Sequence, residues 1–206
     1  MTGAAGRPEL AALRVSDPAE RWAALGFHVE ASALRLGGVS IELGAPGRGI
    51  VAWRLRGVDG VGGLDGLATE VEHETPEDQP AVHPNGAIGL DHVVVVTPRF
   101  ERTADALAGV GLELRRIRRA PGGIRQGFRR LGPAILELVE APDQSDGPAR
   151  FWGLVVNVSD LDALAERLGD TLGEVRPAVQ LGRRIATLRS SAGLDEALAF
   201  MSLEDA

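Results

Sequence analysis

The sequence predicts an α+β protein built from repeated modules, each made of a strand, a helix and three further strands (βαβββ). Three observations lead to this prediction. Four segments share an apolar run followed by a short amphipathic stretch with helical spacing. Three of these amphipathic stretches end at or just before glycine, which is typical of helix C-termini. Glycine-punctuated patterns typical of β-hairpins follow three of the four.

The first two modules are expected in the N-terminal part of the chain. The first has a strand at residues 10–15, a helix at Ala19–Leu25 and two further strands around Gly37-Gly38. Asp17 and Pro18 precede this helix, as a cap acceptor and a proline at the first helical position. The second has a strand at residues 50–59 and a helix at Leu64–Thr69. It then loses the pattern.

The third and fourth modules are predicted to be complete. The third has a strand at residues 90–98, a helix at 99–108 and hairpins over 112–139. The fourth has a strand at residues 152–160, a helix at 161–168 and hairpins over 175–202. Ser159 and Asp162 have the spacing of a capping box at the start of the last helix.

A linker is expected over residues 70–85, where acidic residues and prolines crowd together. It places a domain boundary near residue 80, which divides the chain into residues 1–80 and 81–206. His73 and His83 lie in this segment and are expected to be solvated.

The composition excludes several kinds of chemistry. The 206 residues contain no cysteine, tyrosine or lysine. Thiol nucleophiles, thiolate metal sites, disulfides, Schiff bases and a P-loop lysine are therefore excluded. A net charge of −7 disfavours nucleic acid and anionic membranes as partners. The chain has no long apolar span and no signal-peptide pattern, so a cytoplasmic protein with a small-molecule ligand is expected.

Two stretches carry a resemblance to a known superfamily. Gly89–Pro98 (GLDHVVVVTP) and Ala134–Glu140 (AILELVE) resemble the first and fourth module strands of the vicinal oxygen chelate proteins. This superfamily includes glyoxalase I, extradiol dioxygenases, and bleomycin- and fosfomycin-resistance proteins. The resemblance implies curved, barrel-like mixed sheets with helices on the outside. Residues 81–206 would form a glyoxalase-like paired domain, and residues 1–80 a degenerate pair.

The same resemblance implies that His92 and Glu137 are metal ligands. On their strands each shares a face with apolar residues, where a charged group is costly unless it is paired or bound to a cation. An imidazole and a carboxylate suit a divalent ion such as Zn²⁺, Ni²⁺, Fe²⁺ or Mn²⁺. The alternatives are a half-buried strand histidine, and a Glu137 that pairs with Arg129 or Arg130.

The partner module departs from the pattern of the superfamily. Aligning residues 158–160 with 96–98 puts Leu154 where a second histidine should be, and Ala199 falls where a second glutamate should be. Two protein ligands make a weak site. The alternative is metal-free chemistry, in which Glu137 and His92 act as a base and its partner.

Further residues are candidates for substrate binding. Arg125 and Gln126 lie where an arginine fork would hold an anionic group, unless they belong to an exposed strand face. Trp152 would stack at the mouth of the cavity. The remaining predicted wall residues come from the fourth module: Leu154, Val156, Ala199 and Met201.

Three functions remain open. The first is a glyoxalase-like enzyme, of lyase, isomerase or dioxygenase type, acting on a small oxygen-bearing metabolite. The second is a non-catalytic protein that binds or sequesters a small molecule, as resistance proteins do. The third is a scaffold whose sheet edges are covered by a second copy, which would make the protein a homodimer.

Overall fold

The computed structural model describes residues 7–58, 63–73, 81–142 and 146–204. Within these ranges the chain forms two mixed β-sheets and three α-helices. The domain boundary predicted near residue 80 lies outside the described residues. No helix in these ranges has both the length and the apolar character needed to cross a membrane.

The N-terminal part of the chain forms the smaller sheet. Strands β1 (Glu9–Val15) and β4 (Ile50–Arg56) are antiparallel neighbours at its centre. Each has a parallel partner on its other side, β3 (Val39–Glu42) beside β1 and β5 (Thr69–Val71) beside β4. Helix α1 (Ala19–Ala24) connects β1 to the edge strand β2 (Ala33–Leu36). The first module is therefore a shortened βαββ unit, as the sequence predicts.

The prediction of a helix over Leu64–Thr69 is wrong. Leu64 and Leu67 instead form an isolated bridge across Asp65 and Gly66, whose φ angles are +49° and +94°. Two successive residues with positive φ make a tight hairpin turn and cannot continue a right-handed helix. Both leucines are buried. Their three-residue spacing, which suggested a helix face, arises here because they face each other across a two-residue turn.

The C-terminal part of the chain forms the larger sheet from two complete modules. Strands β6 (Ala87–Thr97) and β10 (Arg150–Val158) are antiparallel neighbours at its centre. The order across the sheet is β11-β12-β13-β10-β6-β9-β8-β7. The bounds of the other elements are α2 Phe100–Ala108, β7 Arg116–Arg119, β8 Arg125–Leu131, β9 Ala134–Glu140, α3 Leu161–Leu168, β11 Arg176–Pro177, β12 Arg184–Thr187 and β13 Ala197–Ser202.

Helix α3 starts and ends for local reasons. The side chain of Asp160 accepts hydrogen bonds from the backbone N–H groups of Asp162 and Ala163, at 3.0 and 2.9 Å. The cap is therefore Asp160 rather than the predicted Ser159. The helix ends at Gly169, whose φ of +50° favours glycine.

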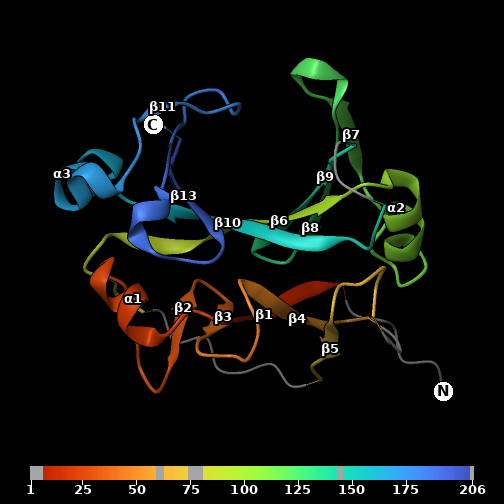
Figure 1. The fold of residues 1–206 in the computed structure, drawn as a ribbon, viewed down its shortest axis with the longest axis horizontal. Coiled ribbons are helices and arrows are strands. Elements are labelled where there is room, and N and C mark those ends of the chain that lie inside the picture. Colours follow the sequence, from red (N-terminus) through yellow and green to blue (C-terminus); the bar gives the residue numbers. More distant parts are fainter. Residues whose placement is uncertain (1–6, 59–62, 74–80, 143–145, 205–206) are drawn as a thin grey trace.

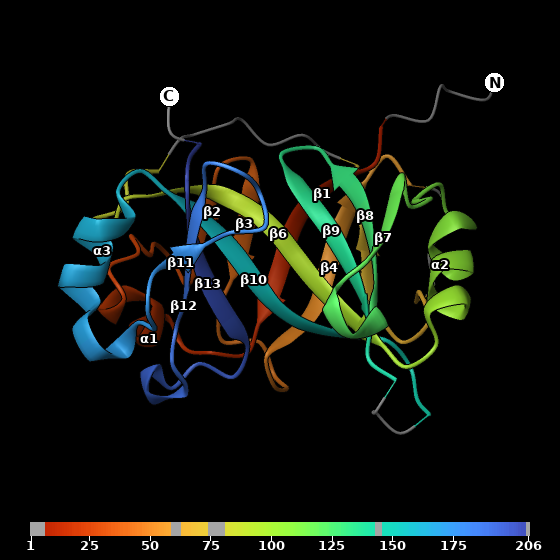
Figure 2. The same ribbon diagram turned by 90° about the horizontal axis from the view of Figure 1, so that it is seen from above.

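The two sheets stack on each other, as Figure 1 shows. The ends of the larger sheet curve away from the smaller one, and helices α2 and α3 lie on its outer flanks (Figures 1 and 2). The core between the sheets includes Leu13 and Trp53 from the smaller sheet and Val93, Val95 and Val156 from the larger one. The predicted fold class, paired βαβββ modules in curved mixed sheets with outer helices, is confirmed. The larger sheet is curved and open, with β11 and β7 as its edge strands.

His83 is buried, in contrast to the prediction of a solvated linker residue. Its Nδ1 accepts a hydrogen bond from the backbone N–H of His28 at 3.0 Å, and its Nε2 lies 2.7 Å from the carbonyl oxygen of Arg35. Asn85 is also buried and donates to the carbonyl oxygen of Leu25 at 3.1 Å. These polar side chains satisfy backbone groups of β2 and of the segment between α1 and β2, which a count of acidic residues and prolines does not reveal.

Candidate functional site

The concave face of the larger sheet holds a cavity of about 370 Å³. Its volume falls in the range of small-molecule sites, and its wall is mostly apolar. The polar side chains on this wall are Gln126, Glu137 and Thr187. The apolar ones include Val94, Val96, Val139, Val155, Ile185 and Ala199, with Trp152 at one side.

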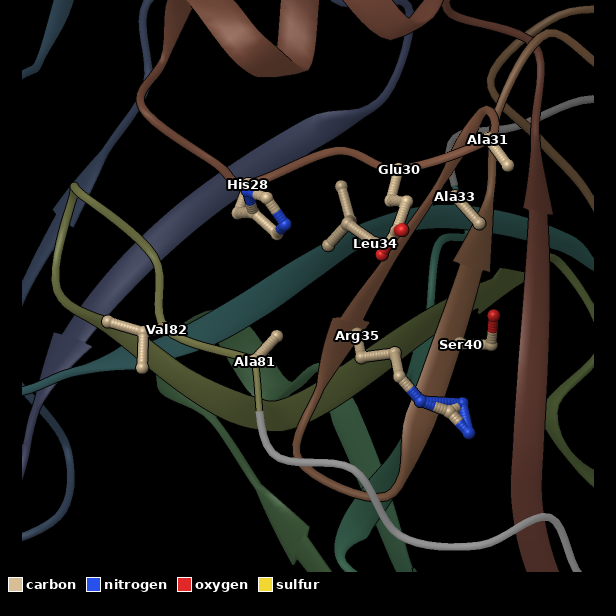
Figure 3. A pocket seen from close by; sticks show the side chains of 9 residues that line it. All are labelled: His28, Glu30, Ala31, Ala33, Leu34, Arg35, Ser40, Ala81 and Val82. Atoms are coloured by element: carbon tan, nitrogen blue, oxygen red, sulfur yellow. The ribbon is translucent and has the colours of Figure 1, made fainter.

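A larger hollow, of about 620 Å³, lies at the edge of the smaller sheet. Figure 3 shows that its polar side chains come from the loop before β2 and from strands β2 and β3, and that they do not converge on one point. His28 and Glu30 on its wall are exposed. A hollow with solvated and divergent polar groups has little to hold a ligand, so the concave cavity is the better candidate.

Strand pairing explains which residues face the concave cavity. Val94 of β6 pairs with Glu137 of β9, and Val96 pairs with Val139, so these four side chains lie on one face. Residues between them on β6, such as Val95, point into the core between the sheets. The alternation predicted for Glu137 therefore places it on the cavity wall.

Glu137 is held by a chain of hydrogen bonds. Its Oε1 accepts from Nε2 of Gln126 at 2.9 Å, and Oε1 of Gln126 accepts from Nε of Arg118 at 2.9 Å. Burial raises the pKa of Glu137, and attraction to His92 and Arg118 only partly opposes this. The ion pair with Arg129 or Arg130 that was the alternative is not formed, because Arg129 pairs with Glu113 on the other face.

His92 is 3% exposed and is not among the residues that line the cavity. It sits at a β-bulge, where β6 uses the extra residue Asp91 between its pairs with Val155 and Val156. A bulge turns two successive side chains to the same side, so Asp91 lies against the His92 ring and contacts its Nδ1.

Arg183 completes this buried group. Its Nη2 lies 3.0 Å from Oδ2 of Asp91, its Nε donates to the carbonyl oxygen of Ser202 at 2.8 Å, and it also contacts Asn157. Burial acts to raise the pKa of Asp91, but the contacts with His92 and Arg183 lower it to about 2. The carboxylate thus carries its charge inside the sheet because two basic groups surround it.

The residues on the concave face do not fit a metal site. In the ranges that the structure describes, no group of three or more histidine, cysteine, aspartate or glutamate side chains is placed to hold an ion. His92 does not line the cavity, and Glu137 is held by Gln126. A metal normally needs about three protein ligands, and this face supplies at most two.

The fourth module, which would supply the other half of a metal site, cannot complete a ligand set either. His92 pairs with Val155, and Val94 pairs with Gly153, so the two-fold relation between the modules makes Gly153 the counterpart of His92. A Cβ at Gly153 would lie 2.3 Å from the carbonyl oxygen of Ala197, so no side chain fits there. Ala199 is the counterpart of Glu137, as predicted. The sequence alignment had put Leu154 in the place of Gly153.

The predicted substrate-binding residues fall into two groups. Gln126, Trp152, Leu154 and Ala199 line the cavity, and Met201 packs beside it against Ala199. Leu154 also packs in the core between the sheets. Val156 belongs to that core and does not line the cavity.

Arg125 is placed on the outer face, in contrast to the prediction. It pairs with Glu101 of α2 and with Glu140, at 2.8 Å for the latter, and stacks over the ring of Phe100. Arg118 on the neighbouring strand is the arginine that connects to Glu137 through Gln126, and the sequence did not single it out. The alternation of side chains along β7 could have indicated that Arg118 faces the cavity. This alternation can be assigned to a face of the sheet only once the pairing of Arg118 with Gln126 is known.

Comparison with solved structures identifies the fold. A mutant of 4-hydroxymandelate synthase from Streptomyces coelicolor is similar over 98% of this chain and 94% of its own, with a TM-score of 0.66 and 16% identity. This chain therefore has the fold of the vicinal oxygen chelate proteins, as the resemblance implied.

Weaker similarities cover about half of the chain. Methylmalonyl-CoA epimerase from Mycobacterium tuberculosis matches 57% of this chain and 89% of its own, with 20% identity and a TM-score of 0.48. A Streptomyces coelicolor methylmalonyl-CoA epimerase variant in complex with 2-nitronate-propionyl-CoA matches 56% and 97%, with 18% identity and a TM-score of 0.45. No protein-family model and no curated protein matches the sequence.

Proposed function

We propose that the protein binds a small, largely apolar molecule in the concave cavity and holds its polar group with Glu137 and Gln126. The observation that carries this proposal is the contrast in the cavity wall. Apolar side chains from several strands surround one carboxyl and one carboxamide, which are hydrogen-bonded to each other at 2.9 Å. A wall of this kind buries the body of a ligand and fixes its orientation through few polar groups.

The proposed function does not require a metal. A ligand that hydrogen-bonds to Glu137 finds a carboxyl with a raised pKa, which is a donor when protonated and an acceptor when ionised. The buried Asp91–His92–Arg183 group lies beside this wall, at the bulge of β6, and the His92 ring contacts Phe128. Of the two main functions predicted from sequence, the cavity therefore supports small-molecule binding best.

Filling the cavity should abolish binding without unfolding the protein. Ala199→Phe adds a ring at a position that lines the cavity, next to Val155 and Met201. We expect at least a tenfold loss of affinity for fragments found in a screen, because the ring occupies the binding volume. Tryptophan fluorescence reports binding directly, since Trp152 is 48% exposed at the cavity whereas Trp22 and Trp53 are fully buried.

Leu181→Phe is the matched control for this variant. Leu181 is 96% exposed and does not line the cavity, so the same ring placed there should leave binding unchanged. Fragments that bind Ala199→Phe as tightly as the unmodified protein would contradict the proposed site.

A second function, general acid–base catalysis by Glu137, is favoured by one observation. Burial raises the pKa of this carboxyl in an apolar cavity, and a pKa closer to neutrality makes a carboxylate a better base. The ionised form is the base. Activity should therefore rise with pH through the raised pKa and reach a plateau above it.

Glu137→Gln separates catalysis from binding. The amide keeps the shape and accepts the hydrogen bond from Gln126, so we expect unchanged thermal stability and retained fragment binding. Transfer of deuterium from D2O into a bound carbon acid, followed by NMR, should be lost in this variant. If unmodified protein and variant exchange deuterium at the same rate, Glu137 is not the base. The cavity then remains a binding site.

A further inference from the structure

Strand β7 and the residue before it form an arginine-rich edge of the larger sheet. The segment reads Arg115, Arg116, Ile117, Arg118 and Arg119, in a chain with a net charge of −7. Figure 2 shows β7 beside β8 near helix α2, at the end of the sheet opposite β11. Arg116 pairs with Phe128 and Arg118 pairs with Gln126, so both share the concave face with these residues.

Arg116 and Arg118 differ from other arginines of this module in their surroundings. Among the described residues, no aspartate or glutamate oxygen lies within 4.0 Å of either guanidinium. Other arginines of the same module are paired, such as Arg125 with Glu140 at 2.8 Å and Arg129 with Glu113 at 3.9 Å. Arg125 and Arg129 are thus neutralised on the outer face, whereas Arg116 and Arg118 keep their positive charge on the concave face.

The side chain of Arg118 is held in place beside the cavity. Its Nε donates to Gln126, which lines the cavity, and its Cζ lies 5.0 Å from the centre of the Phe128 ring. Because one N–H and one face of the guanidinium are used, its two terminal nitrogens remain as donors. An arginine fixed in this way loses less side-chain freedom when it binds an anion.

The carboxyl of Glu137 forms no ion pair with either arginine. Glu137 is bonded to Gln126 rather than to a guanidinium, and its burial favours the neutral form. Along one row of the sheet, Arg116, Phe128, Glu137 and Val94 follow one another on neighbouring strands. A ligand on this row passes from a basic edge to an apolar interior.

We propose that the ligand of the concave cavity is an amphipathic anion, whose carboxylate or phosphate group is bound by Arg116 and Arg118 while its apolar body fills the cavity. This inference rests on the proposed function and adds the charge class of the ligand. Guanidinium groups bind both kinds of anion through paired charge-assisted hydrogen bonds. The carboxyl of Glu137 lies between the anion and the apolar body, where it meets the first atoms of that body.

The test compares three probes of similar size that differ in charge: phenylacetate, phenyl phosphate and phenylacetamide. Binding is followed by the fluorescence of Trp152. We expect at least one anion to bind about tenfold more tightly than the neutral amide, and less tightly as salt is added. The double variant Arg116→Gln/Arg118→Gln should lose this advantage, so that it binds the anions and the amide about equally. The tighter of the two anions identifies the natural group as a carboxylate or a phosphate.

Arg119→Gln is the matched control. Arg119 lies on the same edge strand and carries the same charge, but it faces outward beside Arg125. Equal affinity for anions and amide, or an equal loss of anion affinity in the control, would overturn the inference. Amide binding that Ala199→Phe abolishes would leave the proposed function intact in that case. If none of the probes changes the fluorescence at millimolar concentration, both proposals fail.

Discussion

Trp53→Ala is expected to destabilise the whole protein by about 3–5 kcal/mol, the range measured for removing a large aromatic side chain from a core. Trp53 is fully buried in β4 of the smaller sheet. Its ring meets the ring of Phe151, from β10 of the larger sheet, at 5.4 Å and a steep angle. Its Nε1 also donates to the hydroxyl of Thr69 at 2.7 Å, so the alanine variant loses a hydrogen bond as well as apolar burial.

Urea unfolding followed by far-UV circular dichroism and by fluorescence measures this effect. Because Trp53 joins the two sheets, both probes should report one transition shifted to lower urea concentration. Trp152→Ala is the control, since this neighbour of Phe151 is half-exposed and its removal should change stability much less. Two separate transitions in the Trp53 variant, with one unshifted, would show that the larger sheet is stable without the smaller one.

The sequence predicted the fold well because local signals and module order agree. Apolar runs predicted β6 and β10, glycines marked the hairpins, and helices α2 and α3 lie within one residue of the expected starts. The fold class follows from such patterns because each module buries one face of its strands and of its helix.

The candidate site was only partly predictable because three register shifts interrupt the pairing of β6 with β10. One is at Asp91 in β6, one separates Phe151 from Gly153 in β10, and one lies between the pairs that Asn157 and Val158 make with β6. Counting every second residue across a bulge assigns the wrong face. A separate error of one residue came from aligning residues 158–160 with 96–98. It put Leu154 in the position that Gly153 holds as the counterpart of His92, and it placed Val156 in the cavity.

Long-range polar contacts could not be predicted from the sequence, for a different reason. Asp17 was predicted to cap helix α1, but no side-chain cap is formed there. Its Oδ2 instead accepts a hydrogen bond from the backbone N–H of Asp195, 178 residues away, at 3.0 Å. A capping sequence and a buried partner look alike in one dimension, because both place a short acidic side chain before a helix.

The second large effect that we expect is a decline of stability with rising pH. Its cause is Glu196, which interacts with Asp17. Glu196 is buried just before β13, and neither of its oxygens has a hydrogen-bond donor among the described residues when it is ionised. Burial raises the pKa of Glu196 to about 9, helped by a hydrogen bond to Asp17 and repulsion from it. Asp17 also accepts from Arg21 at 2.8 Å, and Asp195 lies 3.6 Å from Arg48, so both neighbouring acids have basic partners of their own.

The sign of the effect follows from the two states. Unfolded Glu196 loses its proton near its ordinary pKa of 4.5, whereas the folded protein keeps the proton up to a pKa of about 9. Below pH 4.5 both states are protonated, and the group changes nothing. Between these values the unfolded state binds fewer protons, so stability falls by up to about 1.4 kcal/mol per pH unit. Above pH 9 the folded state must hold an ionised Glu196 against Asp17, and this contribution to stability is fully lost.

Glu196→Gln should remove this dependence. The amide is neutral at every pH, and its Nε2 can donate to Asp17 as the protonated carboxyl does. We expect urea midpoints at pH 5, 7 and 9 to fall steeply for the unmodified protein and to stay nearly level for the variant, which is then the more stable protein at pH 9. Glu166→Gln, which removes the same formal charge from an exposed position on α3, should keep the steep decline. Parallel declines for all three proteins would mean that Glu196 is ionised in the folded protein, and that the two sheets meet at Asp17 through its bonds to Arg21 and Asp195 alone.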